Sequence, residues 1–169
     1  MKQFKKLLLI AVFMLGAGGV ANAQKIGHID TAKLFQEMPG TIKMKAELEK
    51  MSKTYRDDIG ALETKLQDKL KRYEAEAKAQ TQETNAKREA EVRQEAARIQ
   101  QAKKLATQEL QKKEGELSNP LILKAQKAIK DVAAAKGLAY IFNSAPGGGL
   151  IIFDKGIDIY SAVKTKLGF

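Results

Sequence analysis

Residues 41–119 read TIKMKAELEKMSKTYRDDIGALETKLQDKLKRYEAEAKAQTQETNAKREAEVRQEAARIQQAKKLATQELQKKEGELSN, and this stretch decides the fold. It runs for 79 residues without a proline, has glycine only at Gly60 and Gly115, and contains 33 charged side chains. So few apolar side chains do not offset the entropy of ordering a compact globule. The sequence therefore predicts one long helix, or two helices folded back on each other. The functional residues are then expected on a helical arm.

Apolar residues in the first half of this stretch recur at steps of three and four. They are Met51, Tyr55, Ile59, Leu62, Leu66, Leu70, Tyr73 and Ala77. This spacing is typical of an amphipathic helix and fits an eleven-residue repeat better than a heptad. The second half has an alanine-rich seam that buries little area, so we expect an arm that is modestly stabilised and able to bend.

The pattern is weakest over 75–90, which holds no apolar residue larger than alanine. We expect the helix to reverse here, with Thr84 or Asn85 capping the second helix. Neither glycine nor proline marks this point, so the local sequence does not exclude an unbroken helix. An unbroken helix of this length would span about 120 Å and isolate the strand expected near its start, which favours a hairpin.

The segment before the arm, residues 24–40, predicts one strand and one short helix. We expect a strand at 25–29, followed by a helix that Asp30 caps and that Pro39-Gly40 ends. Thr41 is then expected to cap the long helical stretch.

The segment after the arm, residues 120–169, predicts a helix, a β-hairpin and a short helix. Pro120 suits the first position of a new or kinked helix, and Gly137 suits its end. The hairpin is expected to pair 138–143 with 150–153 across a glycine-rich turn, and Asp158 is expected to cap the last helix.

The first 23 residues have the pattern of a secretory signal peptide. Three lysines precede an apolar run from Leu7 to Val20, and Ala21-Asn22-Ala23 supplies small residues two apart. The run is shorter than the roughly 20 residues that span a bilayer. We expect cleavage after Ala23 and export. Removing three lysines would lower the net charge from +10 to 10 − 3 = +7.

The residue types that catalysis needs are scarce. The chain has no cysteine and one histidine, His28, which excludes His/Cys metal sets and Cys/His nucleophile pairs. Ser144 would have only His28 as its base, and no nucleophile elbow surrounds it. A strand is expected after Gly147-Gly148-Gly149, which favours a hairpin turn over a phosphate loop. The sequence predicts no enzyme, cofactor or metal.

Basic residues gather on the returning half of the arm. Residues 98–130 contain eight basic and three acidic side chains, enough to bind phosphate. No aromatic residue lies between Tyr73 and Tyr140 to stack against bases, so we expect no nucleic-acid partner. Anionic lipid or lipopolysaccharide is the alternative partner, and ordinary solvated charge is the competing interpretation. The candidate contacts are Lys103, Lys104, Lys112 and Lys113.

The aromatic and branched residues are concentrated at the two ends of the chain. Short strands and helices of this size bury a limited fraction of their surface, so we expect several copies to pool their ends into one core. The sequence therefore predicts an obligate homo-oligomer.

The order of these features resembles the Skp/OmpH family of periplasmic chaperones. The resemblance rests on Lys25-Ile26-Gly27-His28-Ile29-Asp30, Leu34-Phe35, the long charged helical stretch, and 127–153 with its strand, glycine turn and strand. It implies an α+β homotrimer in which three chains build a small β-barrel body, and long helical-hairpin (coiled-coil) arms enclose a cavity. It also implies an ATP-independent periplasmic holdase that binds unfolded outer-membrane proteins and prevents their aggregation in transit.

Four residues of the arm near the body are candidates for client contact, because flexible methionine suits promiscuous binding. They are Met44, Leu48, Met51 and Tyr55. The alternative is that they only pack against the returning helix or the body. Arm tips of the family are described as strongly basic, whereas residues 74–98 here have a net charge of −1.

Two other functions stay open: an exported coiled-coil or envelope stalk, and a basic protein that binds membrane surfaces.

Overall fold

The computed structural model describes residues 25–147 and 155–169. In chain order it contains strand β1 (Ile26–Ile29), helix α2 (Thr31–Glu37), helix α3 (Pro39–Glu76), a 3-10 turn η1 (Ala77–Ala79), helix α4 (Gln82–Ala135), strands β2 (Tyr140–Asn143) and β3 (Ile157–Asp158), and helix α5 (Tyr160–Leu167). The predicted signal peptide with its cleavage site, and the strand predicted at 150–153, lie outside the described residues. The described chain is mostly helical with a small sheet, in agreement with the α+β prediction.

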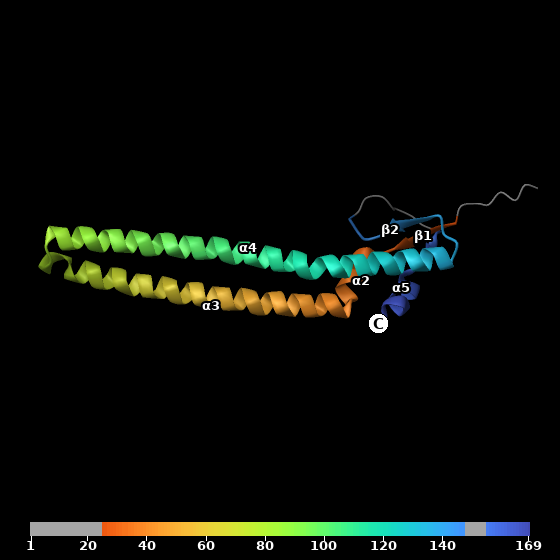
Figure 1. Ribbon diagram of the computed structural model, residues 1–169, viewed down its shortest axis with the longest axis horizontal. Coiled ribbons are helices and arrows are strands. Elements are labelled where there is room, and N and C mark those ends of the chain that lie inside the picture. Colours follow the sequence, from red (N-terminus) through yellow and green to blue (C-terminus); the bar gives the residue numbers. More distant parts are fainter. Residues whose placement is uncertain (1–24, 148–154) are drawn as a thin grey trace, which may run out of the picture.

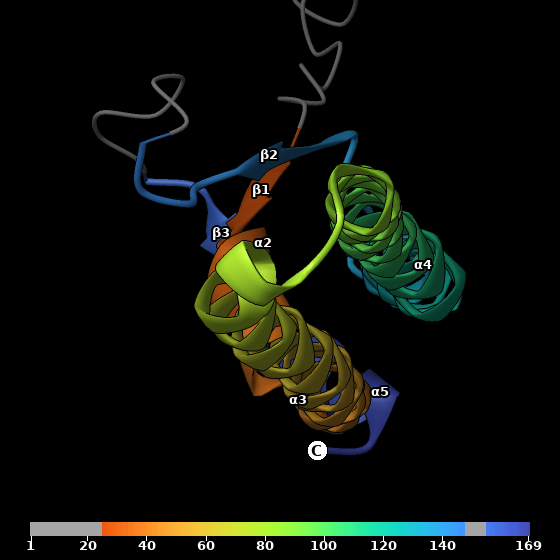
Figure 2. The same ribbon diagram turned by 90° about the vertical axis from the view of Figure 1, so that its left-hand side faces the viewer.

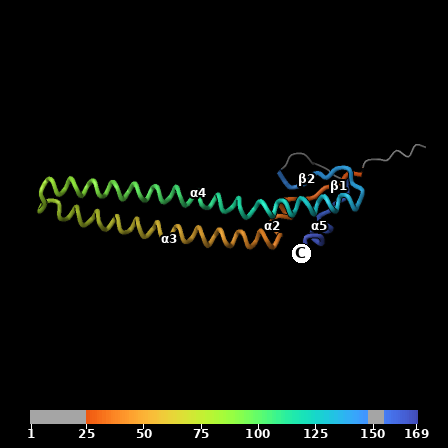
Figure 3. Tube along the Cα trace, viewed as in Figure 1, coloured from red at the N-terminus to blue at the C-terminus, as the bar shows by residue number. Residues whose placement is uncertain are grey.

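Helices α3 and α4 form an antiparallel hairpin that projects from a small body (Figures 1 and 3). With 38 residues, α3 is about 57 Å long. Viewed along the arm, the two helices are separate rods, with the strands to one side of them (Figure 2). The chain reverses at 77–81, inside the 75–90 window.

The cap of α4 differs from the prediction. Thr81 is the N-cap, and its hydroxyl accepts a hydrogen bond from the Thr84 N–H at 3.2 Å. The Asn85 side-chain amide instead donates to the Ala77 carbonyl at 2.9 Å. The predicted caps, Thr84 and Asn85, therefore lie in the first turn of α4, and Asn85 closes the reversal from inside the helix.

The predicted cap of the first arm helix is also wrong. Met38 is the N-cap of α3 with extended backbone, and Pro39 follows at the first helical position, where its fixed φ fits and its missing N–H is not needed. Thr41 is buried at 5% exposure inside the first turn. Asp30, by contrast, caps α2 as predicted by accepting from the Lys33 N–H at 2.9 Å.

Pro120 does not begin a new helix, because α4 continues through it from the arm into the body. The proline removes one backbone hydrogen bond of the helix. Helix α4 is nevertheless packed against neighbouring elements both before and after this position. A Cβ at Gly40 would stand 2.5 Å from Leu121 Cδ2, so α3 and α4 touch closely just beyond the proline. The arm and the body therefore share one helix across the boundary that the sequence predicted at 119/120.

The described strands form a parallel sheet in the order β2-β1-β3. Ile26 pairs with Tyr140, and His28 pairs with Phe142. The sequence predicted β2 as one arm of a hairpin, whereas its partner within the described residues is β1, from the other end of the chain. Gly27 makes this pairing close, because a Cβ there would stand 2.8 Å from the Leu138 side chain and 3.0 Å from the Ile157 carbonyl oxygen.

The body has one small core where β1, α2, α4 and α5 meet. Lys136 is the C-cap of α4, and Gly137, which the sequence predicted as the cap, follows it with φ 61° and turns the chain toward β2. Asp158 accepts the Tyr160 N–H at 2.8 Å at the start of α5, although Ile159 occupies the N-cap position. The core is made by Ile29, Leu34, Met38, Ala125, Ala128, Val132, Ile159 and Val163.

Candidate functional site

The arm is the largest feature of the described chain, and its chemistry is that of a contact surface. Within residues 25–147 and 155–169 no three His, Cys, Asp or Glu side chains are grouped to hold a metal ion. In the same ranges no helix is both long enough and apolar enough to cross a membrane. The surface of the arm carries apolar and charged side chains along α3 and α4.

The four predicted client-contact residues are half-buried on the side of α3 that faces α4. Each of them precedes, by about five helical turns, a residue that contacts α4 or lines a cavity with it. Residues a whole number of turns apart lie on the same side of a helix. Lys69 and Tyr73, for example, bond to Glu91 of α4, which places Met51 and Tyr55 on the same side. Each of the four exposes part of its surface beside the seam: Met44, Leu48, Met51 and Tyr55.

Other apolar residues of the arm are more exposed than those four. Leu105 is 50% exposed and Leu123 is 65% exposed. They stand about five turns apart, on one side of α4 and off its alanine seam. The sequence signal that could have found them is their departure from the seam's spacing. The arm and its root also expose Ile42, Leu62, Leu70 and Ile122.

The four candidate lysines divide into two pairs. Lys103 forms an ion pair with Glu63 at 2.6 Å, and Lys113 forms one with Glu47 at 3.0 Å. The hydrogen bond with Glu47 raises the pKa of Lys113. Both bridges cross the hairpin and hold α3 against α4. Lys104 and Lys112 are exposed. Of the four lysines, these two therefore present their charge best to a partner.

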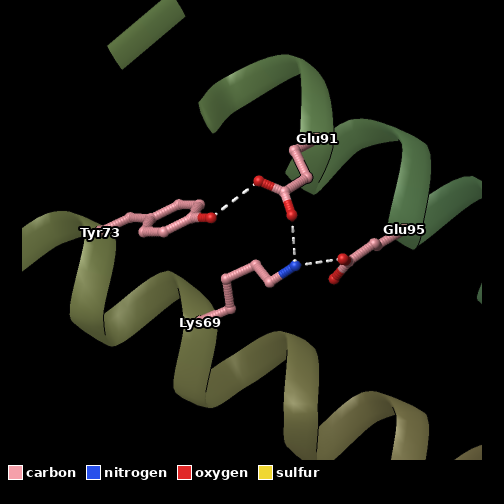
Figure 4. Close-up of polar contacts among 4 residues, drawn as sticks. All are labelled: Lys69, Tyr73, Glu91 and Glu95. Atoms are coloured by element: carbon pink, nitrogen blue, oxygen red, sulfur yellow. Dashed lines mark hydrogen bonds and ion pairs between the residues drawn. The ribbon is translucent and has the colours of Figure 1, made fainter. Parts of the chain in front are cut away.

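A polar network crosses the hairpin near its tip (Figure 4). The Lys69 ammonium lies between the carboxylates of Glu91, at 2.6 Å, and Glu95, and the Tyr73 hydroxyl donates to Glu91 at 2.7 Å. The bonds to Glu91 and then Glu95 raise the pKa of Lys69 to about 12. The bonds from Lys69 and then Tyr73 lower the pKa of Glu91.

A second contact extends this network toward the turn. Arg88 of α4 forms an ion pair with Glu76 of α3 at 2.6 Å, and its guanidinium lies 4.4 Å from the centroid of the Tyr73 ring. None of these side chains is recognisable as functional from the sequence, because their pairing depends on which residues of the two helices face each other.

His28 and Ser144, which the sequence discounted as a catalytic pair, lie together in the body. His28 Nδ1 is 3.3 Å from Ser144 Oγ, and the Ser144 N–H donates to the Ile29 carbonyl at 3.0 Å. Nucleophilic catalysis needs an oriented base and a site for the developing oxyanion in addition to such a contact. The observed bonds tie the end of β2 to β1, which is a structural role.

One face of the sheet is left uncovered by the described helices. Tyr140 is 53% exposed and Phe142 is 44% exposed, and their rings stack with centroids 6.5 Å apart. Ile26, which pairs with Tyr140, is also 44% exposed. Three large apolar side chains gathered on a small body make an apolar patch that favours contact with another protein surface.

Comparisons with known proteins point to one family. The family model described as "Outer membrane protein (OmpH-like)" matches residues 25–167. A protein named Chaperone protein Skp from Photorhabdus luminescens is 24% identical over 143 residues, covering 83% of this chain and 87% of that protein. A second protein of that name, from Photorhabdus laumondii subsp. laumondii, is 28% identical over 145 residues with the same coverage.

A solved structure is similar in fold. It comes from Caulobacter crescentus CB15 and is described as OmpH-like. The TM-score is 0.74 at 14% sequence identity, and the match covers 85% of this chain and 83% of that one. At this identity the likeness concerns the fold alone.

Proposed function

Because the chain belongs to the OmpH-like outer membrane protein family, we propose that it is an ATP-independent holdase chaperone of the periplasm. Its clients are unfolded outer-membrane proteins, which it keeps from aggregating during transit. The observation that supports this function is the family membership of a chain with a long helical arm that exposes apolar and charged side chains. We propose no catalytic activity and no cofactor.

The physical basis of holding is a wall of weak contacts. An unfolded β-barrel protein exposes alternating apolar side chains, and the arm offers half-exposed apolar groups such as Leu62, Leu70 and Leu105. Each contact contributes little, so a client is retained by many contacts at once and is released without nucleotide. Met44, Leu48, Met51 and Tyr55 contribute the parts of their side chains that remain exposed beside the seam.

We propose that three copies assemble through the uncovered face of the sheet. The patch of Ile26, Tyr140 and Phe142 is apolar, and it lies on a body whose own core is small. Burying such rings against other copies stabilises both the assembly and each subunit. A β-barrel body built by three chains would place three arms around one cavity.

A light-scattering assay tests the holdase function. An outer-membrane protein diluted from urea aggregates, and the mature protein at one trimer per client should suppress the scattering without any nucleotide. Added ATP should change nothing. Undiminished scattering at a several-fold excess of the protein would exclude the function and favour an exported coiled-coil stalk.

Contact with anionic lipid or lipopolysaccharide is proposed for the exposed lysines of α4. Lys104 and Lys112 are the candidates, since Lys103 and Lys113 are paired with glutamates. Vesicles containing phosphatidylglycerol should bind the wild-type protein at low salt and bind the Lys104→Ala, Lys112→Ala variant roughly thirty-fold more weakly, because each surface lysine adds about 1 kcal/mol. Equal binding by both proteins would remove this contact from the proposal.

A further inference from the structure

The distal part of the arm, from the turn back to Ile99, is poorly closed by apolar packing. The only fully buried side chain that the structure describes in α3 is Thr41, at the other end of the helix, and the first in α4 is Ile99. Beside the distal helices lies a pocket of about 440 Å³ that is open to solvent, with Leu70, Ala77 and Val92 in its lining. Apolar side chains that line an open pocket contact water there instead of the facing helix, so they make fewer of the dispersion contacts that hold most helix pairs together.

Six polar residues bridge this poorly packed part. We call them the distal clasp: Lys69, Tyr73 and Glu76 on α3, and Arg88, Glu91 and Glu95 on α4. Every member bonds to at least one member on the opposite helix. The side chains of Lys69 and Glu91 and the Tyr73 hydroxyl point toward one another across the gap between the two helices (Figure 4).

The two cations of the clasp are less exposed than those of the other ion pairs across the hairpin. The side chains of Lys69 and Arg88 are 19% and 20% exposed, whereas that of Lys103 is 43% exposed. Their partners Glu91 and Glu76 remain accessible to water and salt, at 46% and 43% exposed. Exposed pairs contribute little because water and salt screen them. Lys69 differs from an isolated surface cation, because it bonds to both Glu91 and Glu95, and losing its charge leaves two carboxylates that face each other without a cation between them.

We propose that the distal clasp is an ionic latch, which keeps the distal part of the hairpin closed and which salt or loss of one charge releases. On release, α3 and α4 separate from the tip as far as Ile99, while the root and the body stay folded. The root stays closed because Gly40 packs tightly on Leu121 and the body core lies beyond it. This latch goes beyond the proposed function, since it sets the shape of the arm whether or not a client is bound.

Hydrogen exchange measured by mass spectrometry on the full mature protein tests the latch. Separated helices of this polarity are marginal alone, so opening should expose the amides of 82–98 to exchange. Lys69→Glu should accelerate exchange there about tenfold. This value lies between the small effect of losing an exposed ion pair and the large effect of losing a buried one. Wild-type protein should show the same local acceleration at about 1 M salt, where charges are screened within about 3 Å.

Two further variants make the test specific. Lys71→Glu makes the same charge change on an exposed residue two positions away and should leave exchange unchanged. The variant with Lys69→Glu, Glu91→Lys and Glu95→Lys restores opposite charges and should return exchange toward the wild-type rate. The latch is overturned by unchanged distal exchange in Lys69→Glu, by equal acceleration in the amides of 121–132, or by failure of the reversed charges to slow exchange.

Discussion

At the scale of single residues, Gly27 shows how closely the strands of the body approach. A Cβ at this position would stand 2.8 Å from Leu138 Cδ1 and 2.9 Å from Ile141 Cδ1. Real Cβ contacts are not that short, so Gly27→Ala must displace these two side-chain ends, and the Ile157 carbonyl oxygen at 3.0 Å leaves the new methyl group little room on the other side. We expect a loss of about 1–3 kcal/mol in the free energy of unfolding, as for other overpacked cores, measured by urea denaturation.

Gly60 provides the matched control for this prediction. It lies inside α3, and a Cβ there would meet nothing within 4 Å. Gly60→Ala should raise the free energy of unfolding by up to about 1 kcal/mol, because alanine favours helix more than glycine does. A stabilising effect of both substitutions would mean that the strands of the body are not packed around Gly27 as described.

Thr81 decides where the second helix of the arm begins. Its hydroxyl accepts the Thr84 N–H, so Thr81→Ala removes the cap and should cost about 1 kcal/mol. Thr84→Ala should cost less, because the Thr84 hydroxyl only contacts that of Thr81, at 2.8 Å. Urea titration followed by helical circular dichroism compares the two variants. A larger loss for Thr84→Ala would assign the cap to the wrong residue.

At the scale of elements, periodicity predicts a helical arm, and the length of an unbroken helix favours a hairpin, but neither shows how the two helices face each other. Thr81, Thr84 and Asn85 are all good capping residues, and no glycine or proline chooses among them. The choice depends on contacts between the helices, such as the bond from Asn85 to Ala77, which are tertiary. The way in which the two helices face each other also pairs Lys103 and Lys113 with glutamates. The sequence alone therefore could not show which of the four candidate lysines form ion pairs.

The strands illustrate a second limit of the sequence. β1 and β2 have four residues each, too few for a reliable alternation, and they lie at opposite ends of the chain. Nearness in sequence favours a hairpin between 138–143 and 150–153, whereas the observed partner of β2 is β1. Parallel pairing of this kind becomes visible only once the hairpin arm has brought the two ends together.

Pro120 makes a testable weak point in α4. It lacks the N–H that would bond to the Glu116 carbonyl, within a helix that otherwise runs from the tip to the body. Pro120→Ala should restore this bond and raise the free energy of unfolding by about 1–3 kcal/mol. Hydrogen exchange should slow most at 115–121. Gly115→Ala, which adds no hydrogen bond, should stabilise by about 1 kcal/mol at most. A destabilised Pro120→Ala would show that the local geometry of α4 depends on the proline.

At the scale of the whole molecule, the described body is small for the arm that it supports. Its core has eight buried residues, three of which are alanine or methionine without a branched side chain. The arm adds length without adding a core, because its seam is half-buried. Assembly of several copies would resolve this imbalance, since it would bury the exposed sheet face and bring several arms together around one space.

The proposed assembly makes the last prediction. Tyr140 and Phe142 expose about half of their surface, and burying these rings against other copies should contribute roughly 2 kcal/mol per subunit. The Tyr140→Ser, Phe142→Ser variant should therefore shift the protein from trimer toward monomer, measured by sedimentation at micromolar concentration. Leu105→Ser, which removes an equally exposed apolar side chain from the arm, should leave the trimer intact. A double variant that still sediments as a trimer would place the interface elsewhere, and a stable wild-type monomer would refute the assembly itself.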